Sequence, residues 1–318
     1  MACNVAMLGK STYYYKKKGT RKGKQPSVQT LKNGKLVSNV KVVERIKEII
    51  GAPFIDYGYD KTTKILKQEG YFINWKKVYR LMKENSLLNN KIKKSSASNR
   101  YVAYGKPLPS RPFEIIEIDF KYIWIEGIRK SAYLLTLLDT FQRQAYNWSL
   151  TLDMKTQRVE ELIKNFISSH LMHQKLDPNK LEIIIRSDNG PQFISKLYRK
   201  VLDELKIKYH HIPPATPQMN GHIEAFHSTV KRLVCKPYCF ESLSHAIEVF
   251  NSFYETYNHR RILRVLLYRS PIEFYNLWVE GKIGVTLKNG KRKFFLKEKE
   301  PNNGSFSHED FVLQTQIK

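Results

Sequence analysis

The sequence has little of several features that mark secreted and membrane proteins. Only three cysteines occur in 318 residues (Cys3, Cys235 and Cys239), too few for a disulfide framework and typical of a reducing compartment. The sequence contains no run of about 18 apolar residues, which is the length needed to cross a membrane. The apolar start, residues 1–8, is too short and too lightly charged for a signal peptide. We therefore expect a cytoplasmic protein with no membrane partner.

Acidic residues are also scarce. The chain has 29 Asp and Glu against 55 Lys and Arg, which gives a net charge of +26. The first hundred residues carry much of this excess, with 23 basic and 6 acidic side chains. So large an imbalance indicates a polyanionic partner, best explained by nucleic acid. The length allows two or three domains with a sizeable core.

The N-terminal third divides into two predicted parts. Residues 1–40 are basic and lack apolar periodicity, which predicts a flexible arm. Residues 41–90 show helical periodicity in three segments with a short link at Gly70, and this pattern favours a helix-turn-helix DNA-binding domain. A small helical bundle of no special function is the alternative. In the DNA-binding interpretation, the last helix presents three cations to DNA: Lys76, Lys77 and Arg80.

The rest of the chain is predicted to be a linker, an α/β core and a tail. Residues 91–110 are polar and charged and end in prolines, as a linker does. Residues 111–276 alternate strands and helices, which predicts a mixed sheet flanked by helices. Residues 277–318 form a basic C-terminal tail, either a small hairpin around 288–296 or a loose segment. The expected core strands lie near 114–124, 131–139, 143–151, 181–187 and 208–212, with helices after 156, over 191–205 and around Glu224.

Three carboxylates stand out in the core. Asp119 lies in an alternating strand, and taken alone it reads as an exposed strand residue. Asp188 ends an apolar strand before a Gly-Pro turn, where α/β proteins collect site residues, although an Asx turn would also explain it. Glu224 lies on a helix, with 35 residues between it and Asp188. Lys231 follows seven residues later on the same helix side, where it could hold a DNA backbone.

Phosphoryl transfer is the chemistry that three carboxylates and a basic chain suit best. Two Mg²⁺ ions about 4 Å apart can stabilise the entering and leaving oxygens of an in-line displacement. Magnesium prefers hard oxygen ligands, which carboxylates supply, and Mn²⁺ can substitute for it. We predict two ions per site held by Asp119, Asp188 and Glu224, with Asp119 as the bridging ligand. Water or a DNA 3′-hydroxyl would attack.

Residues 111–275 resemble the retroviral-integrase-type core of bacterial insertion-sequence transposases. Residues 57–82 also look like the helix-turn-helix that precedes this core, and residues 11–14 resemble the family's entry segment. The match thus spans roughly 10 to 275, and the motifs occur in the family's order. The core motifs are DFKYI at 119–123, SDNGPQF at 187–193, PQMNGHIE at 217–224 with Lys231, and Tyr257-Asn258 followed by Arg261, Leu266, Pro271 and Phe274.

This resemblance implies a ribonuclease-H-like fold, a two-metal Asp-Asp-Glu site, and DNA cleavage followed by strand transfer. It adds Asn220 and Arg261, which lie in the matching motifs, to the predicted DNA-binding residues. The implied partners are the element ends, target DNA and further copies of the chain on DNA. The implied location is the bacterial cytoplasm, in association with the nucleoid. In many relatives such a chain is the second of two reading frames, and an upstream helix-turn-helix protein recognises the element's ends.

Two other functions suit parts of the same sequence. A DNA-binding protein with an inactive core would use residues 41–90 alone. A nuclease of the ribonuclease-H fold would cut DNA without joining it. A transposase needs metal and Asp188 for turnover, whereas a DNA-binding protein with an inactive core has no turnover to lose. A transposase also joins DNA ends, whereas a nuclease does not.

Overall fold

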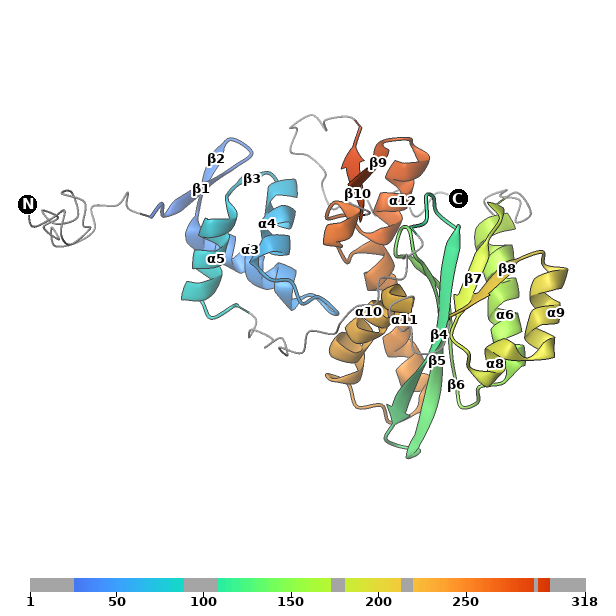
Figure 1. Cartoon of the computed structure of the whole chain (residues 1–318). Coiled ribbons are helices and arrows are strands. Elements are labelled where there is room, and N and C mark those ends of the chain that lie inside the picture. Colours follow the sequence, from blue (N-terminus) through green and yellow to red (C-terminus); the bar gives the residue numbers. More distant parts are fainter. Residues whose placement is uncertain (1–25, 89–107, 173–180, 213–219, 289–290, 298–318) are drawn as a thin grey trace, which may run out of the picture.

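The computed structural model describes residues 26–88, 108–172, 181–212, 220–288 and 291–297 (Figure 1). Within these ranges a small N-terminal unit is followed by a larger α/β unit. Most of the predicted arm, the linker up to residue 107 and the tail from residue 298 lie outside the described residues. No helix in the described part of the chain is long and apolar enough to span a membrane.

The three predicted helices of the N-terminal unit are present. They are α3 (Asn39–Gly51), α4 (Tyr59–Gln68) and α5 (Trp75–Glu84). Asn74 caps α5, since its side chain accepts the backbone N–H of Lys77 at 2.8 Å. The apolar sides of the helices meet in one buried cluster that includes Val42, Ile46, Leu66, Val78 and Met82.

The arm predicted over residues 1–40 is wrong in its last part. A hairpin of β1 (Gln29–Lys32) and β2 (Lys35–Ser38) stands there, and β3 (Tyr71–Phe72) pairs with β1. The turn is Asn33-Gly34, and both residues have positive φ angles, 46° and 82°. An Asn-Gly pair is the strongest short-range hairpin signal, because both residues tolerate this conformation. The high lysine content concealed it.

The larger unit contains a five-stranded sheet. Its strands are β4 (Ile115–Ile125), β5 (Lys130–Asp139), β6 (Ala145–Thr151), β7 (Ile184–Ser187) and β8 (Lys208–His211). The spatial order is β6-β5-β4-β7-β8. The first three strands in sequence pair antiparallel, whereas β7 and β8 extend the sheet in parallel from β4. This is the ribonuclease-H-like mixed α/β fold that the resemblance implied.

Helices cover both faces of the sheet (Figure 1). On one face lie α6 (Thr156–Phe166), α8 (Pro191–Ile194) and α9 (Lys196–Glu204), which share a buried cluster with Ile116 and Ile118. The single helix predicted over 191–205 is broken at Ser195. The Ser195 hydroxyl accepts the backbone N–H of Tyr198 at 3.1 Å and starts α9 anew.

The other face is covered by α10 (Gly221–Val230) and α11 (Leu243–His259), which pack on Ile123 and Ile125. A π-helical turn, Lys231–Cys235, continues α10. Beyond them, α12 (Pro271–Val279) and the hairpin β9 (Ile283–Lys288) and β10 (Lys291–Leu296) enclose a separate aromatic cluster. Of the two predictions for the tail, the hairpin is correct for residues 283–296.

Candidate active site

Two of the three predicted ligands come from neighbouring strands. β4 and β7 run parallel, and their register pairs Glu117 with Arg186. Asp119 lies two residues beyond Glu117 on β4, and Asp188 directly follows the last residue of β7. Side chains two residues apart in a strand point to the same face of the sheet. The Asp119 carboxylate therefore belongs to the face of Glu117 and Arg186, and Asp188 lies at the end of the neighbouring strand.

That face is the one covered by α10. Glu117 Oε2 accepts the backbone N–H of Ile223, in the first turn of α10, at 2.7 Å. Further along β4, Ile123 and Ile125 pack in the cluster that contains α10 and α11. Asp119, between these positions and in phase with them, faces α10 as well.

The carboxylate of Asp119 is half-buried against α10. Its Oδ2 lies 3.4 Å from Nδ1 of His227, and the His227 side chain is itself buried. Its Oδ1 accepts the backbone N–H of Phe120 at 2.8 Å. Asp119 is thus a positioned residue on a helix-covered face, in contrast to the exposed strand residue that its local sequence suggests.

Glu224 lies one helical turn before His227 and is exposed. Desolvation, together with the negative charge of Asp119, raises the pKa of the Glu224 carboxyl above its usual value, while His227 lowers it. Because Asp119 affects this pKa, the two carboxylates are close enough to interact electrostatically. The strand of Asp119 and the helix of Glu224 therefore meet at one site.

Asp188 lies at the strand end in a tight turn. Its Oδ1 accepts the backbone N–H of Gly190 at 2.9 Å, so the Asx turn expected as an alternative is present. Asn189 anchors the turn to the neighbouring strand, because its Nδ2 donates to the carbonyl oxygen of Ile212 at 2.7 Å.

A complete three-ligand cluster is not formed. Across the described ranges, no group of three or more His, Cys, Asp and Glu side chains is close enough to hold a metal ion. The structure brings Asp119 and Glu224 together and leaves Asp188 at the adjacent strand end. The donor types fit Mg²⁺ or Mn²⁺, since all three are carboxylates and no thiolate competes with them.

Sequence reasoning missed one buried charged pair beneath α10. Glu117 and Arg186 are only 1% and 3% exposed, and Glu117 Oε1 lies 3.7 Å from NH1 of Arg186. Burial raises the pKa of Glu117 to about 7. The strand alternation put Glu117 in the polar phase with Asp119. A buried acid in that phase could be inferred only by knowing that α10 covers it.

Comparisons with known proteins agree with this arrangement. Two models of the integrase core domain match residues 109–217 and 205–271, and a model of an HTH-like domain matches residues 37–95. The Escherichia coli (strain K12) protein named "Putative transposase InsK for insertion sequence element IS150" is 27% identical over 283 residues, which cover 86% of this chain and 91% of that protein. The chain belongs to the insertion-sequence transposases with an integrase core domain.

The chain is also similar to a second curated transposase and to a solved integrase core. The Lactococcus lactis subsp. lactis (strain IL1403) "Transposase for insertion sequence element IS904" is 26% identical over 243 residues, covering 73% of this chain and 92% of that protein. Among solved structures, the HTLV-2 integrase catalytic core domain in complex with magnesium is 19% identical. It covers 52% of this chain and 97% of that chain, with a TM-score of 0.36.

The HTH-like domain and the integrase core both imply DNA as the partner of a transposase, so the position of each predicted DNA contact matters. On α5, Lys76 is exposed. Lys77 is held by the hairpin, because its Nζ donates to the carbonyl oxygen of Gln29 at 2.5 Å. Arg80 lies 3.3 Å from Glu84 and also donates to the carbonyl oxygen of Ser27. The open stripe of α5 therefore contains Trp75, Lys76, Tyr79 and Lys83.

Two predicted DNA contacts are wrong. Asn220 is 5% exposed and lies at the start of α10. Arg261 is 4% exposed, with NH2 at 2.6 Å from Oδ1 of Asp56 and NH1 donating to the carbonyl oxygen of Phe54. Arg261 thus joins the core to the N-terminal unit, and both side chains are too buried to reach a duplex. Lys231, by contrast, is exposed beyond α10.

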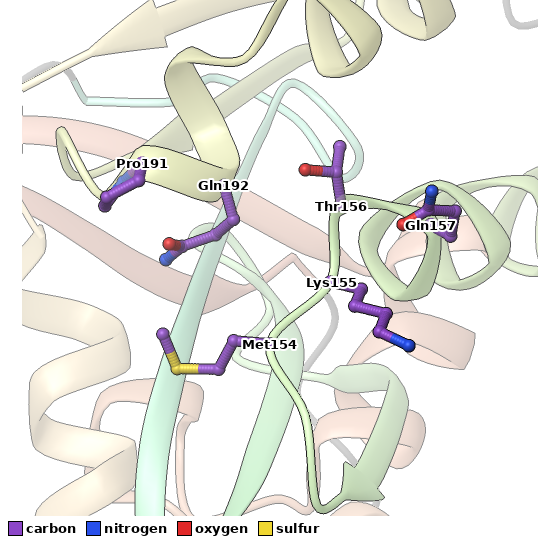
Figure 2. A pocket seen from close by; sticks show the side chains of 6 residues that line it. All are labelled: Met154, Lys155, Thr156, Gln157, Pro191 and Gln192. Atoms are coloured by element: carbon purple, nitrogen blue, oxygen red, sulfur yellow. The ribbon is translucent and has the colours of Figure 1, made fainter.

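A shallow hollow adjoins the turn that follows Asp188. Gln192 and Met154 extend into the same side of it (Figure 2). No carboxylate, histidine or cysteine is among its lining residues, so we assign the chemistry to the carboxylates and not to this hollow. Its lining residues are Met154, Lys155, Thr156, Gln157, Pro191 and Gln192.

Proposed function

We propose that this chain is a DNA transposase that cleaves DNA at the ends of its element and joins those ends to target DNA. The observation that carries the proposal is the position of Asp119 on the sheet face that α10 covers. Asp119 contacts His227 on α10, the helix that carries Glu224, and β4 pairs with β7, which Asp188 directly follows. Two neighbouring strands and one helix would thus supply the three carboxylates that metal-dependent phosphoryl transfer uses.

Asp119, Asp188 and Glu224 would hold two Mg²⁺ ions, or Mn²⁺ in their place. When bound, these ions stabilise the charge that develops on the entering and leaving oxygens of a phosphodiester. The half-buried carboxylate of Asp119 is the best placed of the three to bridge, since it lies between the strand of Asp188 and the helix of Glu224. Lys231 would hold the DNA backbone beside the site.

DNA binding by the N-terminal unit would come first. Lys76 on the open stripe of α5 is our leading contact, and Lys77 and Arg80 would reach phosphates only from the edge of that stripe. Joining two ends requires more than one active site, so we also propose a multimer on DNA. Because the proposed substrate is chromosomal DNA, we place the reaction in the bacterial cytoplasm. An upstream helix-turn-helix protein would be a further partner.

The test uses end-labelled duplexes that carry the element's flanking ends, both intact and pre-cut to expose a 3′-hydroxyl. Wild type is compared with Asp188→Asn and with Asp203→Asn, an exposed control on α9. We expect metal-dependent cutting and joining by wild type and the control only, and unchanged DNA binding in all three. Equal joining by Asp188→Asn would refute the site.

Two other outcomes identify the alternatives. Binding without cutting or joining by wild type, even on pre-cut ends, would indicate a DNA-binding protein with an inactive core. Cutting without joining of pre-cut ends would indicate a nuclease.

A further inference from the structure

The start of α10 has no cap of its own. The N-cap residue Asn220 makes no side-chain hydrogen bond to the helix, and the first backbone N–H groups of any helix lack intrahelical partners. Glu117 fills this role from β4, since its Oε2 accepts the N–H of Ile223 at 2.7 Å. A carboxylate at this end also interacts favourably with the helix dipole.

The same carboxylate is fixed from behind by β7. Arg186 pairs with Glu117 in the sheet register, and its guanidinium lies 3.7 Å from Glu117 Oε1. Both side chains are buried, so neither oxygen is positioned by solvent. Glu117 Oε1 makes no hydrogen bond in the structure, so its contact with Arg186 is an ion pair, and Oε2 alone is fixed by a hydrogen bond, to Ile223.

This small network touches all three elements that carry the predicted ligands. Glu117 precedes Asp119 by two residues on β4, and Arg186 precedes Asp188 by two residues on β7. Ile223 is the residue directly before Glu224. The network therefore connects the backbones of the three ligands, each within two residues, from the buried side of the site.

We propose that Glu117 is a positioning residue that fixes the start of α10 relative to the sheet. It thereby fixes the position of Glu224 relative to Asp119 and Asp188. Glu117 acts through the N–H of Ile223. The consequence for metal binding rests on the proposed function, whereas the cap itself does not.

Two substitutions separate the cap from general stability. Glu117→Gln keeps a carbonyl oxygen that can accept the N–H of Ile223, whereas Glu117→Leu removes the acceptor at similar volume. Thr140→Val is the matched control. It deletes a buried hydrogen bond just beyond β5, in which the Thr140 hydroxyl donates to the carbonyl oxygen of Ile115 at 2.8 Å.

The first readout is amide hydrogen exchange of residues 222–224 in the metal-free protein. We expect Glu117→Leu to speed exchange at Ile223 by about tenfold or more, while Glu117→Gln and Thr140→Val stay close to wild type. Unchanged exchange at Ile223 in Glu117→Leu would overturn the proposal, whatever the protein's activity.

The second readout is binding of Mn²⁺, followed by electron paramagnetic resonance of the free ion. We expect Glu117→Leu to weaken binding by about 10–100-fold, as loss of a supporting residue does, and Glu117→Gln to rescue most of it. Equal weakening by Thr140→Val would mean that stability alone is responsible, which contradicts a positioning role. Absence of Mn²⁺ binding by wild type would count against the proposed function and leave the exchange result standing.

A second inference concerns the hairpin β9–β10, which lies beyond both integrase-core matches, since these end at residue 271. Its inner face is anchored, because Phe294 packs in one cluster with Phe141 and Phe274. The guanidinium of Arg292 lies 4.6 Å from the centre of the Phe141 ring. The outer face is exposed and basic, with Thr286, Lys288, Lys293 and Phe295.

We infer that this outer face binds the phosphate backbone of duplex DNA. Residues 281–297 contain no Asp or Glu, so no acid within the hairpin neutralises the lysines. A two-stranded ribbon is also narrow enough for the major groove of DNA. The inference rests on the proposed function for its choice of polyanion.

The test is the salt dependence of duplex binding by the full chain, measured by fluorescence anisotropy. In the double variant Lys288→Ala with Lys293→Ala, the plot of log K against log salt should become less steep. The magnitude of its negative slope should decrease by about 0.9 for each phosphate that is no longer neutralised. Lys282→Ala is the control, because Lys282 already pairs with Glu280 at 3.0 Å. An unchanged slope in the double variant would overturn the inference. Failure of wild type to bind DNA would instead overturn the proposed function.

Discussion

The N-terminal unit and the α/β core use charge in opposite ways. In the N-terminal unit, lysines such as Lys76 and Lys83 lie on an exposed helical stripe beside Trp75 and Tyr79. In the core, the important acids lie on a sheet face beneath a helix, where Glu117 is almost fully buried and Asp119 half-buried. The first unit displays its charge to solvent, and the second places charge at defined positions.

This difference determines how each unit should respond to mutation. Exposed cations contribute to DNA affinity additively and are screened by salt, so the loss of one changes binding gradually. Positioned carboxylates act only together, so the loss of one removes turnover and spares binding. Substitutions in the two units should therefore differ in kind as well as in size, and we order them from the largest expected effect to the smallest.

Glu224→Gln should abolish metal-dependent cleavage. Loss of a metal-binding carboxylate removes several kcal/mol of transition-state stabilisation, roughly a thousandfold in rate. Because Glu224 is exposed, the unfolding temperature should stay near that of wild type. Cleavage assays and thermal melts check this, with Glu248→Gln on the exposed side of α11 as control. A large drop in unfolding temperature would show that Glu224 stabilises the fold, which contradicts the prediction.

Arg261→Ala should destabilise the contact between the two units. Its guanidinium is buried against Asp56 at 2.6 Å, and breaking a buried pair costs about 3 kcal/mol. The neighbouring side chain of Arg260 is exposed, so Arg260→Ala is a matched control. Chemical denaturation and limited proteolysis between the units check the difference. Equal stability of the two variants would contradict the structural role of Arg261.

Lys76→Ala combined with Lys83→Ala should weaken DNA binding and flatten its salt dependence. The magnitude of the negative slope of log K against log salt should decrease by about 0.9 for each phosphate that the variant leaves without a cation. Lys47→Ala, exposed on α3, serves as control for net charge. Lys77→Ala should act differently, because its ammonium group holds β1, and we expect a loss of stability together with the loss of affinity. Identical effects of all these lysines would show that binding depends on net charge alone.

The smallest expected effect is a pH dependence of stability. Burial raises the pKa of Asp139 from its usual 3.8 to about 6, so the folded state holds this proton more tightly than the unfolded state. The contribution of Asp139 to stability is therefore greatest below pH 4 and decreases as pH rises to about 6. Denaturation of wild type and Asp139→Asn across this range should show a steeper decrease in wild type, because the raised pKa of Glu117 adds its own decrease to both proteins. A parallel pH profile in the variant would contradict it.

Much of the fold could be predicted from local patterns. The apolar alternation of β4, the buried run of β5 and the helical periodicity of α6 each gave an element close to the observed one. The β1–β2 hairpin was missed although Asn33-Gly34 signalled it, because the surrounding lysines suggested an unfolded arm. The break at Ser195 was missed because a single capping serine is a weak signal within a continuous apolar pattern.

The site was predictable as a set of residue types and not as a geometry. Asp119, Asp188 and Glu224 were chosen from their sequence contexts and from a family resemblance, and their role as metal ligands stays a prediction. Arg261 and Asn220 show the limit of this reasoning. A motif position does not reveal whether a side chain faces DNA or the neighbouring unit.

The sequence by itself determined the strongly basic character, the helical and strand periodicities, and the order of the acidic motifs, because each depends on residue type and short-range spacing. Only the tertiary structure decided that Glu117 lies buried under the first turn of α10 and that Arg261 joins two units. Such contacts link residues more than a hundred positions apart, as Glu117 with Ile223 and Asp56 with Arg261. Packing of the helix on the sheet and of one unit on the other sets them, and no local pattern contains that information.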